Sequence, residues 1–407
     1  MNKIGNHDIK ELSLDYGTPL YVYDSQVIED NYNKLKSSFD KYYPNTKVHY
    51  SVKANSNLNI LQIFKDIGCG VDCSSPFELL LSKKIGFDDD KILYTGNYES
   101  LSDFSHLTDY NIKVNLDDIS SFKRMNQVYQ PDVISFRINP GIGKGGYEGI
   151  TTGGTDAKFG VPYEKAVHAY QLAKDNNYKK FGIHMMTGSN NLEPYYFAQV
   201  VEKLMMIAGN IFNQIGSKPE YVDIGGGFGI PYEVDEPELD IDLTAKLVTE
   251  IFLEKCNKYG FGEPELLLEP GRYLIGNAGY LLTKVTGIKN SYKNFVGVDS
   301  GMSTLIRPAL YGAKHRVDVY GKEIPDWNVN ICGQICENSD IFARNVFLPS
   351  VEEGDILIIR DAGAYGFVMS SNYNNRPRPA EVLVKGDEVS LIRRRETFED
   401  MVRFFDL

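Results

Sequence analysis

The sequence predicts a (β/α)8 barrel followed by a separate all-β domain. Eight short apolar runs recur between residues 47 and 268, and helix-length segments separate them. Strands that alternate with helices predict a parallel sheet, and eight such strands predict a closed barrel. After about residue 280 the pattern changes to short strands with few helix-length segments between them. We therefore expect the barrel over residues 28–280 and the β domain over residues 281–407.

The length of the chain agrees with two domains, because 407 residues exceed the roughly 250 residues of a typical barrel. Residues 18–23 have the pattern of a strand, which we expect to carry the N-terminal segment 1–27 into the β domain. Residues 26–42 have apolar side chains at helical spacing. The strands expected in the β domain are residues 283–288, 295–298, 316–320, 329–332, 356–359, 380–384 and 389–392.

Composition excludes several classes of function. The net charge of −12 argues against nucleic acid as a general partner. Apolar runs stay far shorter than the roughly 20 residues of a membrane span, and the N-terminus lacks the apolar core of a secretory signal. A cytoplasmic location is the default expectation. The five cysteines fit reduced thiols, and no histidines stand near the two spaced cysteine pairs, so we expect no metal site.

Most of the barrel runs end in residues that can do chemistry, and barrel active sites lie at the carboxyl ends of the strands. The first run ends in Lys53. A lysine desolvated in a pocket is a nucleophile that can form a Schiff base. The plainer interpretation is a lysine at a strand end whose ammonium reaches water, and for Lys53 taken alone this is the commoner case. The runs cover residues 47–53, 70–75, 92–97, 112–115, 133–139, 181–190, 221–227 and 266–272.

The seventh and eighth runs end in a glycine cluster and in a glutamate. Gly225, Gly226 and Gly227 allow backbone N–H groups to approach an anion, and barrels frequently bind phosphate after these two strands. A simple tight turn is the alternative. Glu269 is able to hold the protonated nitrogen of a pyridine ring, and Arg272 a second anion, unless the two form a local ion pair. Together with the lysine, these features predict pyridoxal 5′-phosphate as the cofactor.

The chain resembles the fold-type III pyridoxal-phosphate decarboxylases, which have an alanine racemase-like barrel, and among them most closely the diaminopimelate decarboxylases. The resemblance extends from about residue 18 to about residue 384. It rests on segments in the family's order: residues 50–55, 225–229, 269–272, 307–313, 336–337 with Asp340, 364–367, 371–374 and 376–379. It implies a carboxy-lyase that releases carbon dioxide from meso-2,6-diaminopimelate and yields L-lysine, the last step of lysine biosynthesis.

The resemblance also implies roles for individual residues. Lys53 and Cys336 would be catalytic, with Cys336 returning a proton to the substrate carbon. The cofactor would be bound by Lys53, Ser189, Gly225, Gly226, Gly227, Glu269, Tyr365 and Met186. The substrate would be bound by Arg272, Arg307, Tyr311, Glu337 and Tyr365. Two arginines suit a distal carboxylate because the guanidinium has the matching planar fork. Family members are homodimers in which the segment of Cys336 and Glu337 reaches the partner's site.

One position departs from the family pattern. The family places a histidine, stacked on the cofactor ring, two residues before the glycine of a Gly-Ser pair. This chain has Met186 there, followed by Thr187, Gly188 and Ser189. A thioether can lie against an aromatic ring but carries no charge and donates no hydrogen bond. His184, on the same face of the strand by its period of two, is displaced along it.

Three other interpretations stay open at this point. Met186 and a long glycine- and threonine-rich loop at residues 141–157 also fit a related decarboxylase that acts on another carboxylated diamine, in a siderophore, antibiotic or polyamine pathway. A racemase shares the barrel and the lysine. A non-catalytic binding protein on the same fold is a further alternative, although Lys53, Glu269 and Cys336 argue against it.

Overall fold

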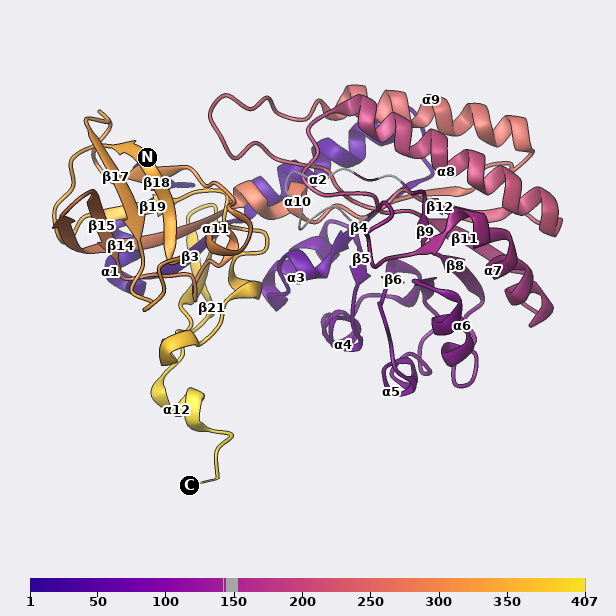
Figure 1. The fold of residues 1–407 in the computed structure, drawn as a ribbon, viewed down its shortest axis with the longest axis horizontal. Coiled ribbons are helices and arrows are strands. Elements are labelled where there is room, and N and C mark those ends of the chain that lie inside the picture. Colours follow the sequence, from indigo (N-terminus) through magenta and orange to yellow (C-terminus); the bar gives the residue numbers. More distant parts are fainter. Residues whose placement is uncertain (142, 144–152, 407) are drawn as a thin grey trace. The chain divides into compact units, whose positions relative to one another are not determined.

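The computed structural model describes residues 1–141, 143 and 153–406, and it divides into two compact units (Figure 1). The first, called the β unit here, contains residues 1–30, 231–236 and 274–407. The second, called the barrel unit, contains residues 31–230 and 237–273. The β unit therefore includes the N-terminal segment and six residues from the middle of the chain, which lie far from it in the sequence.

Eight parallel strands form a closed barrel, as the sequence pattern predicts. The strands are β4 (Thr46–Ser51), β5 (Gly70–Cys73), β6 (Ile92–Tyr94), β7 (Lys113–Leu116), β8 (Val133–Phe136), β11 (Lys180–His184), β12 (Pro219–Asp223) and β13 (Glu265–Leu268). They follow one another around the barrel, and pairing of β13 with β4 closes it. Closure makes neighbours of the ends of β12, β13 and β4, which carry the glycine cluster, the glutamate and the lysine.

Helices connect the barrel strands and cover them from outside. They are α2 (Ser25–Asp40), α3 (Leu58–Asp66), α4 (Pro76–Ile85), α5 (Leu101–Ser105), α6 (Ile119–Met125), α7 (Tyr163–Asp175), α8 (Pro194–Ile215) and α9 (Ile241–Tyr259). The two longest, α8 and α9, pack side by side (Figure 1). Local sequence sets their ends: the Asp240 side chain caps the first turn of α9, and the left-handed Gly260 ends it. Within the described residues, no helix is long and apolar enough to cross a membrane.

The β unit is built on a nine-stranded sheet that contains the predicted N-terminal strand. Strand β14 (Gly279–Asn290) is twelve residues long and pairs successively with β3 (Leu20–Asp24), β19 (Ile356–Ile359) and β15 (Asn294–Val298). Strand β3 in turn pairs in parallel with β20 (Ala380–Lys385). The other strands are β16 (Val317–Val319), β17 (Trp327–Cys332), β18 (Ile341–Leu348) and β21 (Glu388–Arg393).

The structure contains elements that the sequence pattern did not predict. The clearest is β18, where Ala343, Arg344 and Asn345 interrupt the apolar pattern and Asn345 has a positive φ of 51°. The others are β1 (Lys3–Ile4), β2 (His7–Asp8), α1 (Ile9–Tyr16), β9 (Ile138–Asn139) and β10 (Val161–Pro162), together with the short helices α10 (Arg272–Ile275), α11 (Arg307–Tyr311) and α12 (Phe398–Val402). The predicted loop at residues 141–157 lies mostly outside the described residues.

A buried carboxyl group in the barrel unit leads to a prediction about stability. Glu99 is 7% exposed, and its Oε2 has no hydrogen-bond partner among the described residues. Burial raises its pKa to about 7, although the nearby Tyr94 lowers it in part. The folded state therefore keeps a proton that the unfolded state releases above its ordinary pKa of 4.5. Stability contributed by this group is lost as pH rises from about 4.5 to about 7.

Replacing Glu99 with glutamine removes the cost of ionising the buried group. We expect Glu99→Gln to raise the free energy of unfolding at pH 8 by about 2 kcal/mol, with a much smaller gain at pH 5. Urea denaturation at both pH values measures this. The exposed Glu250→Gln on α9 serves as the control, with no gain at either pH. An equal gain at both pH values for Glu99→Gln would show that packing, not ionisation, is responsible.

Candidate active site

The lysine, the glutamate and the glycine cluster lie at the carboxyl ends of three adjacent barrel strands. Strands β12, β13 and β4 are consecutive neighbours in the barrel. Backbone hydrogen bonds continue the pairing past the strand ends, from Glu269 N to Gly225 O at 2.8 Å and from Ser51 N to Pro270 O at 3.2 Å. The three features lie 42 to 216 positions apart in the sequence. Strands β12 and β13 are consecutive, and closure of the barrel by β13 and β4 brings Lys53 beside them.

Lys53 lies in a short 3-10 turn, η1 (Val52–Ala54), directly after β4, and its side chain is 42% exposed. Its Nζ is 2.9 Å from Asp72 Oδ2, at the end of β5, and donates to Ser74 Oγ at 3.2 Å. Burial and the charge of Glu269 raise the pKa of the fully buried Asp72, and Lys53 offsets part of that rise. The amine is thus accessible to a ligand while a carboxylate orients it.

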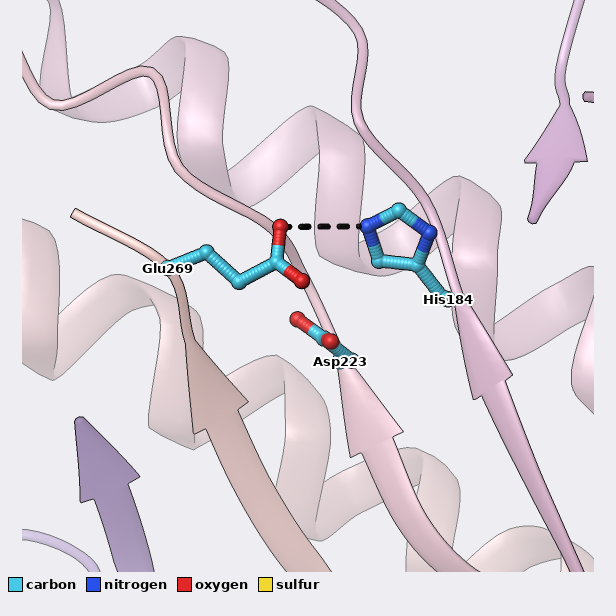
Figure 2. Close-up of side chains that lie close together, drawn as sticks. All are labelled: His184, Asp223 and Glu269. Carbon is cyan, nitrogen blue, oxygen red and sulfur yellow. Dashed lines mark hydrogen bonds and ion pairs between the residues drawn. The ribbon is translucent and has the colours of Figure 1, made fainter. Parts of the chain in front are cut away.

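Glu269 is almost completely buried and faces His184, at the end of β11 (Figure 2). His184 Nε2 is 3.3 Å from Glu269 Oε2. Burial raises the pKa of Glu269, but the charge and hydrogen bond of His184, with the charge of Lys53, lower it to about 2. The carboxyl group is therefore ionised at neutral pH. Its other oxygen, Oε1, faces the carboxyl group of Asp223, and a hydrogen bond with Asp223 contributes to the lowered pKa of Glu269 (Figure 2).

Asp223, at the end of β12, is the third member of this cluster (Figure 2). Its carboxyl group accepts hydrogen bonds from Gly225 N at 2.9 Å and from Asn115 Nδ2 at 3.1 Å. Burial and the charge of Glu269 hold the pKa of Asp223 well above its ordinary range. Ionisation of Asp223 is therefore opposed by the neighbouring negative charge of Glu269.

The glycine cluster packs so closely against neighbouring backbone that its residues have no room for a side chain. Gly225 and Gly227 have φ values of 70° and 93°, which glycine adopts without strain. A Cβ atom on Gly226 would lie 2.3 Å from Glu269 O, so no other residue fits there. Met186 follows β11, and its Sδ lies 3.3 Å from Gly226 N as a hydrogen-bond acceptor. The thioether thus contacts the glycine cluster directly.

Two further predicted residues lie in the barrel unit. Arg272 begins α10 and is 5% exposed, and its Nη2 donates to Ser189 Oγ at 3.4 Å. The sequence left open a local ion pair between Arg272 and Glu269. In the structure, His184 is the residue that lowers the pKa of Glu269 most strongly. Ser189 and Arg272 lie in the barrel unit, as do Lys53, Glu269 and the glycine cluster.

The remaining predicted residues belong to the β unit. Arg307 is buried in the first turn of α11, and Tyr311 ends that helix. Cys336 and Glu337 are exposed: Cys336 N donates to Asn374 Oδ1 at 3.1 Å, and the Tyr373 hydroxyl donates to Glu337. Tyr365 is half-buried and has a positive φ of 56°. Asp340 supports the Cys336 segment by accepting from Ile335 N at 2.7 Å.

Sequence reasoning missed Asp72 and Asp223, and it placed His184 without a role. All three lie at the ends of barrel strands and face inward, which a period of two could have indicated. A charged residue at the end of an otherwise apolar strand was the available signal. Their contacts with Lys53 and Glu269 could not be predicted from the sequence, because these contacts join different strands of the barrel.

The barrel matches a known family. The family model described as "Pyridoxal-dependent decarboxylase, pyridoxal binding domain" matches residues 27–276. The chain belongs to the pyridoxal-dependent decarboxylases. The two-part architecture of barrel and β domain also matches solved structures of that family, so this decarboxylase is a carboxy-lyase with the predicted fold.

Full-length relatives of this decarboxylase have informative names. Diaminopimelate decarboxylase from Methanothermobacter thermautotrophicus is 44% identical over 403 residues, which cover 98% of this chain and 94% of the relative. Protein TabA from Pseudomonas amygdali pv. tabaci is 34% identical over 399 residues, covering 96% and 93%. The structure of Methanocaldococcus jannaschii diaminopimelate decarboxylase with L-lysine has a TM-score of 0.90 and 34% identity, and the match covers 98% of this chain and 95% of that one.

The barrel residues fit the cofactor of this family. The buried, ionised Glu269 suits a protonated ring nitrogen, and the accessible Lys53 amine suits an aldehyde. The glycine cluster follows β12, at a place where barrels frequently bind phosphate. His184, Asp223 and Glu269 also bring three ligand atoms within 4.8 Å, a spacing that could hold a metal ion. The pyridine assignment explains the neighbouring glycines and lysine as well, which a metal would not.

Met186 provides a test of the one departure from the family pattern. We expect Met186→His to change the turnover of this decarboxylase by less than about tenfold and to leave its substrate unchanged, because the side chain contacts the glycine cluster rather than the substrate's distal end. Steady-state kinetics with a panel of carboxylated diamines measures this. Met206→His, at an exposed position on α8, is the control. A switch of preferred substrate would contradict the expectation.

Proposed function

We propose that this chain releases carbon dioxide from meso-2,6-diaminopimelate and yields L-lysine, as the last step of lysine biosynthesis. The observation that carries the proposal is the set of Lys53, the glycine cluster and the buried, ionised Glu269 on three adjacent barrel strands. Relatives named diaminopimelate decarboxylase, 38–44% identical over 97–98% of this chain, support the same activity. The racemase and the non-catalytic binding protein are less well supported for the same reason.

The barrel residues would hold the cofactor and control its charge. Pyridoxal phosphate supplies an electron sink for the bond to the leaving carboxylate when bound at such a site. Glu269 would accept the ring N–H, and the charge and hydrogen bond of His184 keep Glu269 negatively charged. Asp72 orients the Lys53 amine, and Gly225, Gly226, Gly227 and Ser189 bind the phosphate. Met186, which contacts Gly226, would lie beside the bound cofactor.

The β-unit residues would complete the site and choose the substrate. Arg307 and Tyr311, with Arg272 from the barrel unit, bind the distal carboxylate, since arginine presents a planar fork that matches it. Glu337 pairs with the distal ammonium, and Tyr365 contacts both cofactor and substrate. Cys336 holds the proton that returns to the reacting carbon. These assignments rest on the family pattern of residues 307–313 and 336–337.

We also propose a homodimer with shared active sites. The exposed positions of Cys336 and Glu337 support this, because a proton donor and a substrate ligand exposed on a protomer's surface require a covering partner to exclude water. A dimer mass by light scattering, and activity recovered by mixing Lys53→Ala and Cys336→Ala protomers, would be the expected results. The cytoplasmic location stays a prediction, as do the domain limits at residues 28–280 and 281–407.

A comparison of three substrates tests the proposed activity. The cofactor-loaded protein is assayed for carbon dioxide with meso-diaminopimelate, carboxynorspermidine and D-ornithine at equal concentrations. We expect meso-diaminopimelate to have the highest kcat/KM and L-lysine to be its product. A higher kcat/KM with either other compound would assign the chain to the second candidate, a decarboxylase of another carboxylated diamine. Met186 is the observation that keeps this candidate in the comparison.

A further inference from the structure

We infer that His315 is a positioning residue that fixes the guanidinium of Arg307 and so sets the affinity for a substrate with a distal carboxylate. The inference rests on the proposed function, because it takes Arg307 as the residue that binds that carboxylate. All of the contacts that carry it lie within the β unit. His315 is not among the residues that the family motifs assign to the site.

Local sequence places the two side chains against each other. Arg307 begins α11, and Gly312, with a φ of 66°, ends that helix after five residues. Gly312 N donates to Pro308 O at 3.0 Å, and Ala313 N to Arg307 O at 3.4 Å, so the chain turns back over the first turn. His315 follows three residues after the glycine. Its ring consequently lies beside the arginine that began the helix.

The hydrogen bonds of His315 specify one neutral tautomer. Its Nδ1 lies 2.8 Å from Arg360 O, and a backbone carbonyl only accepts, so Nδ1 carries the hydrogen. Its Nε2 lies 2.9 Å from Arg307 Nη1, and a guanidinium only donates, so Nε2 is the acceptor. A protonated ring, or the other tautomer, would oppose two N–H groups. The histidine therefore serves as an acceptor aimed at the guanidinium.

Packing completes the support of the guanidinium. Tyr232 lies under it, with its ring centre 4.6 Å from Arg307 Cζ, and the same ring meets His315 edge-on at 5.3 Å. Arg307, His315 and Tyr232 are 2%, 7% and 3% exposed. A hydrogen bond in the plane and a ring over the face fix both the rotation and the tilt of a planar group. The direction in which the fork presents its N–H groups is thereby set.

Two substitutions separate positioning from packing. In His315→Gln the side-chain oxygen reaches the place of Nε2 and accepts from Arg307. In His315→Asn the amide replaces Nδ1 and donates to Arg360 O, but nothing replaces the contact to Arg307. We expect His315→Asn to raise KM for meso-diaminopimelate about tenfold or more, with kcat within about threefold of the original. We expect His315→Gln to keep KM within about threefold.

Cofactor absorption and thermal melting of both variants show whether the fold and the barrel site are intact. Equal KM values for the two variants, or a loss confined to kcat, would overturn the inference, since a packing role does not distinguish the acceptor from the donor. In an Arg307→Ala background, His315→Asn is expected to add no further change to KM. An additional loss of similar size would also overturn it.

A measurement on the unsubstituted protein does not depend on activity. Nitrogen-15 NMR of the imidazoles, with His315 identified by its absence from His315→Asn, is expected to show the Nδ1–H tautomer. A protonated ring or the Nε2–H tautomer at pH 7.5 would overturn the inference. If the protein releases no carbon dioxide from meso-diaminopimelate, the proposed function fails, while the tautomer still decides whether His315 orients Arg307.

Discussion

Replacing Lys53 with alanine is expected to lower carbon dioxide release from meso-diaminopimelate by a factor of at least about 10⁴. By the proposed assignment, the amine of Lys53 acts as the nucleophile after β4, and its Nζ lies 2.9 Å from Asp72 Oδ2. Without it, the covalent link to the cofactor aldehyde cannot form. The absorption band of the lysine-bound cofactor should disappear in the same variant, which a titration with pyridoxal phosphate measures.

Lys41→Ala provides the matched control for this experiment. Lys41 lies in the barrel unit, and its side chain is 57% exposed in an ion pair with Asp242. The control should retain the absorption band and full turnover. A Lys53→Ala protein that still released carbon dioxide at a comparable rate would refute the assignment of the nucleophile. Loss of the band with the fold intact, and with Lys41→Ala normal, would establish it.

Glu269→Gln is expected to retain the cofactor and to lower kcat by about 10²–10³-fold. The substitution keeps the shape of the side chain but removes the negative charge that, by the proposed assignment, would hold a proton on the ring nitrogen of the cofactor. The pKa of Asp223 is held well above its ordinary range by burial and by the charge of Glu269, so this carboxyl group is a poor replacement for the lost charge. Stopped-flow kinetics of carbon dioxide release, with cofactor occupancy determined by absorbance, measures the effect.

The control for this variant lies on the same strand. Glu265 begins β13, at the opposite end of the barrel, and pairs with Lys113 at 2.8 Å. Glu265→Gln should leave kcat unchanged, because the residue has no contact with the cofactor site. If Glu269→Gln kept full activity, the ring nitrogen would have another partner, and the assignment of the carboxylate would be wrong.

Much of the barrel could be predicted because each of its strands is a largely apolar run of three to six residues between helix-length segments. Strand β18 could not, because Arg344 and Asn345 interrupt its apolar pattern and partner β17 shifts register opposite them. The sequence predicted that β3 belongs to the β domain, but not that it lies between β14 and β20. Its position in the middle of the sheet joins residues about 260 and 360 positions apart.

The candidate site divides in the same way. Lys53, Glu269 and the glycine cluster could be predicted, because each follows a strand and barrel sites form at those ends. Asp72, His184 and Asp223 were missed as partners because their effects are electrostatic and act across the barrel interior. The ionised state of Glu269 depends on His184, which lies 85 positions away. The 3.3 Å separation between His184 Nε2 and Glu269 Oε2 could not be predicted from the sequence.

By itself, the sequence predicted the fold class from strand periodicity and the cofactor from the residues at the strand ends, and its resemblance to a known family predicted the reaction class. Only the tertiary structure decided in which direction the pKa values of Asp223 and Glu269 shift, which residue orients Lys53 and which tautomer His315 adopts. The physical reason is that charge and hydrogen-bond direction depend on distances of about 3 Å between side chains. Chain closure around the barrel and the turn after α11 set those distances.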